Sequence, residues 1–340
     1  MSPSSLSIRP ALTSFYAIAG RSFCIQALDD RSARLAAVFL SEFRFTPIQD
    51  HPEDEVSYTI RVRSEAPPPE PPGLETFEVA YGHCHTDGIK YYLFIEDSLV
   101  LIGSRDSRVI DVWLGDSTHA RLPTSVVNVM SYAMEGALRR CSLYQLHGAG
   151  IIEPEGGMGA LVIGASGSGK TTVTMHLAAS GWYYLTDDAL IINERAGMIE
   201  AQGTRRIFAV TEKTIDACEF PQLMEALGAP VMSDPSKRRL EPGVAFPDRL
   251  AESCIPEVLF FVSISGEAES RISSLSRGEA MTRLIKFNPW ASYDTSEARG
   301  HLHTLGELVR QCRAYTLDSG LDILNEPGRA ASILSAYMKR

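Results

Sequence analysis

One segment, Gly164-Ala-Ser-Gly-Ser-Gly-Lys-Thr171, constrains the fold of this 340-residue chain more than any other part of the sequence. It matches the pattern G-x-x-x-x-G-K-[ST] at every defining position, and this pattern lies between a strand and a helix. The apolar run Ala160–Ile163 precedes the segment, and Val173 and Leu177 follow it at helical spacing. We therefore predict a strand, a phosphate-binding loop and a helix within an α/β domain.

The residue types of this segment suit the binding of a nucleoside triphosphate. Glycines let backbone N–H groups point inward, and the following helix presents its positive end to the same anion. Lys170 supplies a cation for the β- and γ-phosphates, and Thr171 is placed to ligate Mg²⁺. We expect ATP as the general cellular nucleotide, because no base-reading motif is visible. The predicted nucleotide-binding residues here are Gly164, Ala165, Ser166, Gly167, Ser168, Gly169, Lys170, Thr171 and Thr172.

Two adjacent aspartates, Asp187 and Asp188, follow the next predicted strand, Trp182–Leu185. We expect parallel pairing in this strand–helix–strand unit, and the carboxyl ends of parallel strands meet at one sheet edge. The two carboxylates are therefore expected beside the γ-phosphate, one holding Mg²⁺ and the other accepting a proton from an attacking hydroxyl. A solvated acidic turn is the alternative interpretation, and the aspartates by themselves leave it open.

Three motifs follow one another here: His147-Gly-Ala-Gly-Ile-Ile152, the Gly164–Thr171 segment and Leu185-Thr-Asp-Asp188. Together they resemble the catalytic core of the HPr kinase/phosphorylase family, which is related in fold to ATP-dependent phosphoenolpyruvate carboxykinase. The resemblance covers residues 140–340 in layout and is specific over 146–190. It implies a kinase domain that transfers a phosphoryl group to a serine of a protein or peptide, and it implies self-association into oligomers.

The resemblance also implies roles for single residues. Asp187 would act as the base toward the acceptor, while Asp188 would support it or the metal, so that Thr171 and Asp188 are the predicted metal ligands. His147 would face the reacting phosphates, although a histidine on a strand is by itself more often a satisfied core or edge residue. Together with Lys170, these three residues form the predicted catalytic set.

One segment departs from the family pattern. Ile199-Glu-Ala-Gln-Gly203 is similar to a Leu-Glu-x-Arg-Gly segment of the family, in which the glutamate is associated with Mg²⁺. Gln202 replaces the arginine, and the spacing from the aspartates is shorter. We therefore interpret the chain as a relative of HPr kinase and not as HPr kinase itself.

A basic cluster, Ser236-Lys-Arg-Arg239, stands out in an acidic chain. Guanidinium and ammonium groups suit transferring phosphates, so we expect Lys237 and Arg238 to contact the nucleotide. A solvated loop is the alternative interpretation of such a charge run. Arg205 and Arg206 are lesser candidates for the same role.

The composition excludes several other classes of protein. With 42 acidic and 32 basic residues the net charge is −10, which argues against a general nucleic-acid binder. No apolar run approaches the ~20 residues of a membrane helix, and the first residues lack the pattern of a secretory signal. Six scattered cysteines without a C-x-x-C pair are typical of reduced thiols, so we expect a cytoplasmic protein.

The first part of the chain is predicted to be a β-rich domain, residues 1–120, whose role the sequence leaves open. Pro67–Pro72 indicates a surface loop or stiff spacer, with a polyproline ligand as the alternative. His83-Cys84-His85 lacks a second ligand pair nearby, so we interpret its histidines as exposed residues near a strand turn and not as a metal site. The strand candidates in this part are Val56–Val62, Phe77–Ala80, Lys90–Ile95, Leu99–Ile102 and Arg108–Leu114.

Residues 121–340 are predicted to form the kinase-like domain. Three functional hypotheses remain open for it: a kinase acting on a serine, an ATPase or nucleotide-dependent switch, and a regulatory module that binds nucleotide without catalysis. The other elements expected here are helix Thr124–Arg140, strands Tyr144–Ile152, Gly159–Ile163, Leu190–Asn193 and Val258–Ile264, and helices Lys170–Ser180, Arg277–Lys286 and Arg329–Arg340.

Overall fold

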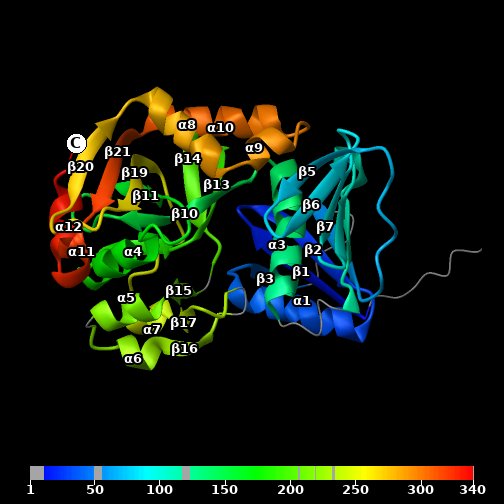
Figure 1. The fold of residues 1–340 in the computed structure, drawn as a ribbon, viewed down its shortest axis with the longest axis horizontal. Helices are drawn as coiled ribbons and strands as arrows, with labels where there is room; N and C mark the ends of the chain where they lie inside the picture. The colour runs from blue at the N-terminus through cyan, green and yellow to red at the C-terminus, as the bar shows by residue number, and fades with distance from the viewer. Residues whose placement is uncertain are drawn as a thin grey trace, which may run out of the picture. The chain divides into compact units, whose positions relative to one another are not determined.

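The computed structural model describes residues 11–49, 56–116, 123–205, 207–218, 220–231 and 234–339. It divides into two compact units, Met1–Cys141 and Ser142–Arg340, which we call the amino-terminal and carboxy-terminal units. Each unit contains one large sheet with both parallel and antiparallel neighbours, so the expected mixed α/β class is confirmed (Figure 1). None of the described helices combines the length and the apolar character that a membrane crossing needs.

The amino-terminal unit is built on a sheet with the strand order β3-β1-β2-β4-β9-β8-β7-β6-β5. Strand β4 pairs in parallel with β2 and β9, and the other neighbours are antiparallel. Its elements are β1 (Leu12–Ile18), β2 (Arg21–Ala27), α1 (Asp30–Glu42), β3 (Thr46–Ile48), β4 (Tyr58–Arg63), β5 (Glu75–Val79), β6 (Gly82–Thr86), β7 (Tyr91–Ile95), β8 (Ser98–Ile102), the 3₁₀ helix η2 (Arg105–Ser107), β9 (Val109–Trp113) and α3 (Pro123–Arg140).

Helix α3 belongs to the amino-terminal unit, so the division lies at Cys141 and not after residue 120 as expected. The helix contacts β8, β9 and α1. The approach is close at Gly136, where an added Cβ would lie 2.6 Å from Ile102 Cδ1. A helix whose apolar side is buried against this sheet folds with it, whatever element follows in the chain.

The carboxy-terminal unit is built on a sheet with the strand order β18-β14-β13-β10-β11-β19-β21-β20, and β12 also pairs with β10. Strand β19 pairs in parallel with β11 and β21. The strands are β10 (Tyr144–Ile152), β11 (Gly159–Ile163), β12 (Tyr183–Thr186), β13 (Ala189–Arg195), β14 (Met198–Gly203), β18 (Ser253–Cys254), β19 (Pro256–Ile264), β20 (Arg271–Leu275) and β21 (Arg313–Ser319). The helices that cover this sheet are α4 (Lys170–Ala179), α8 (Arg277–Phe287), α9 (Trp290–Tyr293), α10 (Ala298–Gln311), α11 (Leu321–Asn325) and α12 (Arg329–Ser335).

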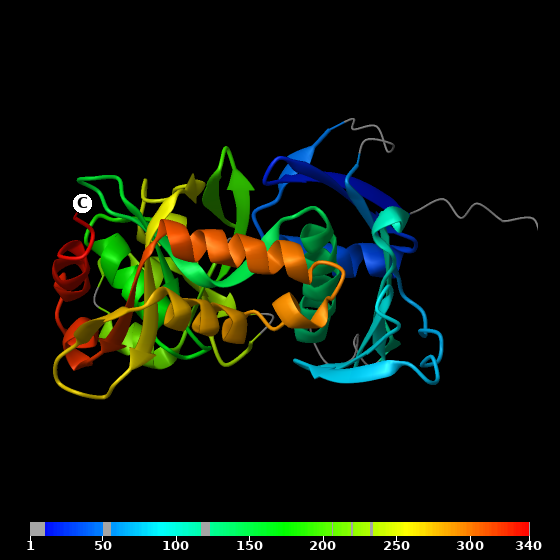
Figure 2. The same ribbon diagram turned by 90° about the horizontal axis from the view of Figure 1, so that it is seen from above.

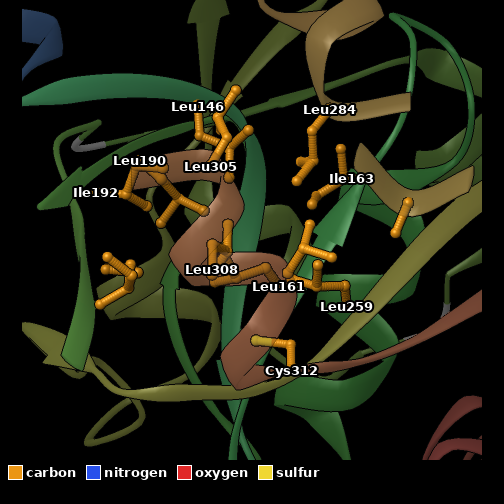
Figure 3. Close-up of a cluster of buried hydrophobic side chains, with 14 of the residues drawn as sticks. Leu146, Leu161, Ile163, Leu190, Ile192, Leu259, Leu284, Leu305, Leu308 and Cys312 are labelled. Atoms are coloured by element: carbon orange, nitrogen blue, oxygen red, sulfur yellow. The ribbon is translucent and has the colours of Figure 1, made fainter. Parts of the chain in front are cut away.

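Helices cover both faces of this sheet, because its central strands are apolar on both sides. Leu161 and Ile163 of β11 pack with α8 and α10, as Figure 3 shows for this cluster. Ala160 and Val162 of the same strand pack with α4, α11 and α12. The two helix layers therefore bury alternate residues of one strand, and Figure 2 shows α8 and α10 lying along each other.

A smaller sheet with the order β15-β17-β16 lies beside α4 in the carboxy-terminal unit. Its apolar core contains Phe208 and Leu240 together with Met175 of α4. The elements of this part are β15 (Phe208–Val210), α5 (Glu212–Ala217), α6 (Leu223–Ala226), β16 (Leu227–Pro230), β17 (Arg238–Leu240) and α7 (Pro242–Ala245).

The expected parallel pairing of the strands before and after α4 is wrong. Strands β11 and β12 run in the same direction, but β10 lies between them and is antiparallel to both. Strand β11 already has β10 on one edge and β19 on the other, so β12 pairs with the remaining edge of β10. The carboxyl ends of β11 and β12 nevertheless meet at the same end of the sheet.

Strands β12 and β13 follow one another along β10, and the two aspartates lie in the break between them. The Gly148 N–H of β10 donates to the Asp188 carbonyl at 2.9 Å across this break. On its other side Gly148 pairs with Ile163, the last residue of β11. One residue of β10 therefore stands between the start of the Gly164–Thr171 loop and the acidic pair.

Candidate functional site

The Gly164–Thr171 loop joins β11 to α4 in a backbone form that only glycines suit. Gly167 and Gly169 have φ angles of +78° and +97°, in the left-handed region. An added Cβ at Gly164 would lie 2.7 Å from the Val262 carbonyl oxygen. No side chain caps α4, so the N–H groups of its first turn lack intrahelical partners and are suited to an anion.

Lys170, the first residue of α4, is buried with its three ammonium protons directed at three acceptors. Its Nζ lies 2.9 Å from each of the Gly164 and Ala165 carbonyl oxygens and 3.0 Å from His147 Nε2. Burial lowers the pKa of Lys170 against the opposing effect of Asp188 and Asp187. To contact a phosphate, the ammonium group must exchange at least one of these three acceptors.

Asp187 is joined directly to the loop. The Thr171 hydroxyl donates to Asp187 Oδ2 at 2.8 Å, and the Ala209 N–H donates to the same oxygen at 3.3 Å. The residue is 1% exposed, and its Oδ1 is buried with no hydrogen-bond partner among the described residues. Burial, together with the neighbouring Asp188 charge, raises the pKa of Asp187 to about 6.

Asp188 has a different environment from its neighbour. Its Oδ1 lies 3.2 Å from His147 Nδ1, its Oδ2 lies 2.8 Å from Arg205, and its side chain is 29% exposed. Burial alone would raise the pKa of Asp188, but its neighbours, chiefly His147 and Arg205, hold the pKa well below its usual range. The carboxyl group is therefore ionised at neutral pH.

His147 bridges the lysine and the acidic pair from strand β10. Burial lowers the pKa of His147, and nearby Lys170 adds to this, while Asp188 opposes it. A neutral imidazole with its proton on Nδ1 satisfies both contacts, because Nδ1 then donates to Asp188 and Nε2 accepts from Lys170. This tautomer is assigned from the contacts.

A cavity of about 460 Å³ opens over the loop and the start of α4. Asp188 reaches it, whereas Asp187 and His147 are not among its lining residues. Gly164, Ala165 and Ser168 of the loop do not line it. The predicted site residues that line the cavity are Ser166, Gly167, Gly169, Lys170, Thr171, Thr172, Asp188 and Lys237.

Only some of the basic residues predicted to contact the nucleotide lie at the cavity. Lys237 lines the cavity and pairs with Asp234 at 3.2 Å. Arg238 lies on β17 and donates to the Gly228 carbonyl oxygen, so it is not brought to the cavity. Arg205 pairs with Asp188, as described above, and Arg206 lies outside the described residues.

Glu200 is not brought to the cavity either. It lies on β14, where its carboxylate accepts from the Ser253 hydroxyl at 2.7 Å and from Arg195 at 3.4 Å. The segment that is similar to the family's Leu-Glu-x-Arg-Gly motif therefore forms part of a strand pair away from the loop.

Several lining residues were not identified from the sequence. Lys213 and Thr214 lie on α5, which begins after the capping residue Thr211. Ile264 ends β19, the parallel neighbour of β11. Because the carboxyl ends of parallel strands meet at one edge, a correct pairing of these two strands would have predicted its position beside the loop. The remaining lining residues come from the ends of β15, β19 and β21 and from α11: Ala209, Gly266, Ser319, Gly320, Leu321, Ile323 and Leu324.

The donor set around Thr171 fits a magnesium ion. The Thr171 hydroxyl and both oxygens of Asp187 are hard oxygen ligands of the kind that Mg²⁺ prefers. The buried Asp187 Oδ1 has no partner among the described residues, and a buried carboxylate oxygen ordinarily has one. These two side chains are therefore the best candidates to hold the ion.

Neither a protein-family model nor a curated protein matches this chain. Function is therefore inferred from the residues of the site. This inference depends on three features at one end of the same sheet: a loop suited to an anion, a buried lysine, and two carboxylates in unlike environments.

Proposed function

We propose that this protein is an ATP- and Mg²⁺-dependent phosphotransferase related in fold to HPr kinase, with a serine hydroxyl of a protein or peptide as acceptor. The observation that carries the proposal is the hydrogen bond of 2.8 Å between Thr171 and Asp187. It joins the anion-binding loop to the acidic pair, so that a γ-phosphate held by the first lies next to the second.

The loop and Lys170 bind the triphosphate in this proposal. The N–H groups at the start of α4 face the phosphates, and Lys170 exchanges a loop carbonyl for a phosphate oxygen. Exposed Ile264 and Leu321 line the same cavity together with Ile323. Their apolar surface suits the face of a nucleotide base, and Lys213 and Lys237 add positive charge at the rim.

The two carboxylates have separate roles in the proposal. Thr171 and Asp187 hold Mg²⁺, which when bound offsets the negative charge of the phosphates. Asp188, which reaches the cavity, accepts the proton of the acceptor hydroxyl as that oxygen bonds to the γ-phosphorus and the bond to ADP breaks. This exchanges the metal and base roles that the resemblance implied for the pair.

The contacts of Asp188 support its role as the base. His147 and Arg205 hold the carboxylate from two sides, which fixes its orientation and keeps it ionised. The low pKa makes it a weak base, and positioning next to the attacking hydroxyl must therefore supply much of its effect. Asp187 has the more suitable pKa, but it is enclosed by Thr171 and Ala209.

The fate of the γ-phosphoryl group tests this function. The full chain is incubated with γ-labelled ATP, Mg²⁺ and a lysate of the source cell, and labelled products are separated. Label on a serine of a protein or peptide supports the proposal. Label found only as free phosphate indicates an ATPase or switch, and label retained in ATP indicates a regulatory module. Asp188→Asn serves as the matched negative control.

Two further expectations belong to the same proposal. The cytoplasm is the proposed location, since six scattered cysteines without a C-x-x-C pair are typical of a compartment in which thiols remain reduced. Self-association is proposed from the resemblance, and sedimentation of the full chain with and without Mg²⁺ and ATP would measure it.

A further inference from the structure

A cluster of three side chains of metal-binding types, one glutamate and two histidines, lies in the amino-terminal unit. Glu70 Oε1 is 3.1 Å from His83 Nε2, and Glu70 Oε2 is 3.2 Å from His85 Nε2. Among the described residues, this is the group of three His, Cys, Asp or Glu side chains whose ligand atoms all lie within 4.8 Å of one another. The interpretation of these histidines as exposed residues near a strand turn missed Glu70, which comes from the proline-rich segment before β5.

The strand geometry brings the two histidines together. His83 and His85 are two residues apart on β6, so their side chains leave the same face of the sheet. Cys84, between them, is buried on the opposite face. Both imidazoles therefore present a nitrogen to one point above the strand, and the carboxylate of Glu70 lies at that point.

Neighbouring side chains hold both rings in place. Phe94 of β7 stacks on the His83 ring at a centroid distance of 5.7 Å and meets the His85 ring edge-on at 5.8 Å. The Thr76 hydroxyl lies 2.8 Å from His85 Nδ1, which leaves Nε2 as the nitrogen directed at Glu70. A hydrogen bond to the second ring nitrogen is the usual support of a metal-bound histidine.

We propose that Glu70, His83 and His85 bind one divalent transition-metal ion of the zinc class. Zinc binds nitrogen and carboxylate oxygen at about 2.0–2.2 Å, which places two ligands of a tetrahedral ion roughly 3.3–3.6 Å apart. The observed nitrogen–oxygen distances of 3.1 and 3.2 Å need little adjustment to reach that spacing. Three protein ligands leave a coordination position open to water or to an exogenous ligand.

Two imidazole ligands disfavour Mg²⁺, the metal proposed for the carboxy-terminal site. Mg²⁺ and Ca²⁺ prefer oxygen ligands, whereas imidazole suits Zn²⁺, Ni²⁺ and Cu²⁺. Without metal, the same three side chains form a hydrogen-bonded bridge in which each Nε2 must carry a proton to donate to Glu70. An ion bound at the Nε2 atoms replaces these protons, so the hydrogen-bonded bridge and the metal site are alternative states of the same three side chains.

Titration of the full chain with Zn²⁺ alone tests the proposal. The protein is first stripped with a chelator, and binding is followed by calorimetry and by the visible spectrum of Co²⁺ in place of Zn²⁺. About one equivalent should bind, and Mg²⁺ should not compete. Glu70→Gln, His83→Ala and His85→Ala should each weaken binding by at least about tenfold, since even loss of an outer-shell partner costs about 10–100-fold.

Matched variants separate this site from other zinc ligands. Glu75→Gln, on the adjacent strand, and His303→Ala, in the carboxy-terminal unit, should bind Zn²⁺ as the unaltered chain does. Thr76→Val should weaken binding about tenfold by releasing the His85 ring. If His83→Ala or His85→Ala does not fold, as judged by circular dichroism, Glu70→Gln and Thr76→Val decide the question.

Two results would overturn the proposal. The first is a stripped protein that takes up no Zn²⁺ at micromolar concentration. The second is binding that survives Glu70→Gln, His83→Ala and His85→Ala unchanged, which would assign the ion to the cysteines or to other side chains. Loss of Zn²⁺ binding in these variants with retained binding in both controls would establish the site.

Discussion

The clusters of ionisable side chains in the two units differ most in their distance from water. At the Gly164–Thr171 loop, Asp187 is 1% exposed, and lysine, histidine and arginine are packed around the acidic pair. In the amino-terminal unit, the side chains of Glu70 and His83 are 55% and 33% exposed. The first cluster therefore has buried charged groups at its centre, Lys170 and Asp187, whereas the second has its carboxylate at the surface and only His85 largely covered, at 13% exposed.

This difference in exposure predicts how substitutions and added ions should affect each cluster. Charges in a buried network depend on one another, because each desolvated group is stabilised by its neighbours. Burial raises the pKa of Asp187, whereas the pKa of Asp188 is lowered because His147 and Arg205 outweigh burial. In the amino-terminal cluster the ligand side chains keep some contact with water when no partner is bound. Substitutions there should therefore change the binding of the added ion more than they change one another.

The largest expected effect separates the two adjacent carboxylates. Asp188→Asn should lower phosphoryl transfer by about 10²–10⁴-fold, the usual contribution of a positioned acid or base, with nucleotide affinity changed only a few-fold. Asp187→Asn should instead raise the Mg²⁺ concentration needed for half-maximal nucleotide binding. Steady-state kinetics and Mg²⁺ titrations of the two variants measure both quantities.

The opposite pattern would restore the roles that the resemblance implied. In that case Asp187→Asn would abolish transfer while leaving Mg²⁺ dependence intact. Equal effects of the two substitutions on every quantity would show that the pair acts as one unit, and the contrast between their environments would then have no functional meaning.

A second effect concerns the buried lysine. Lys170→Ala should weaken nucleotide binding by about 10–100-fold, because a hydrogen bond to a charged group is worth about 1.5–3 kcal/mol. The exposed Lys213→Ala, at the rim of the same cavity, should change affinity only a few-fold. Fluorescence titration with Mg²⁺ and ATP measures both, and unchanged affinity in Lys170→Ala would refute the assignment of the loop.

The smallest effect is a dependence of stability on pH. The pKa of Asp187 is about 6 in the folded chain against the ordinary value of 3.8, so the folded form binds the proton more tightly. The resulting stabilisation is complete below pH 3.8 and is lost as the pH rises through about 6. Relative to Asp187→Asn, the free energy of unfolding should fall by on the order of 1–3 kcal/mol over this window.

Urea denaturation at a series of pH values measures this difference. Asp106→Asn, an exposed aspartate of the amino-terminal unit, should follow the unaltered chain at every pH. The lowered pKa of Asp188 acts in the opposite direction and below this window, where its stabilisation is lost as the pH falls. Identical pH profiles for the unaltered chain and Asp187→Asn would show that burial does not displace this carboxyl group.

The parts of the fold that were predicted most closely are those whose signal is local. Strands Tyr144–Ile152 and Gly159–Ile163 have the expected bounds, and α4 ends at Ala179, one residue before its expected end. Gly164 follows the second strand, Glu153-Pro154 follows the first, and Ser180-Gly181 follows the helix, so turn-forming residues fix the boundaries. The final helix ends at Ser335 and is shorter than expected, since its apolar spacing continues into residues that form a turn.

Features that depend on pairing between distant strands were not predicted. The pattern of β12 shows that it is a strand, but not that β10 separates it from β11. Helix α1 was missed although Asp29 and Ser32 form a capping box at its start. Glu70 has no periodic context at all, and only the folding of its segment beside β6 brings it to the two histidines.

The position of β10 has a consequence for how such a protein can diversify. Its two hydrogen-bonded edges carry different parts of the machinery: β11 and the phosphate loop on one side, the break with Asp187 and Asp188 on the other. Neighbouring strands lie about 4.8 Å apart, so this single strand acts as a fixed spacer. Under the proposed function, substitutions that alter the choice of acceptor would thus accumulate beyond one edge, while the residues proposed to bind the nucleotide, beyond the other edge, stay unchanged.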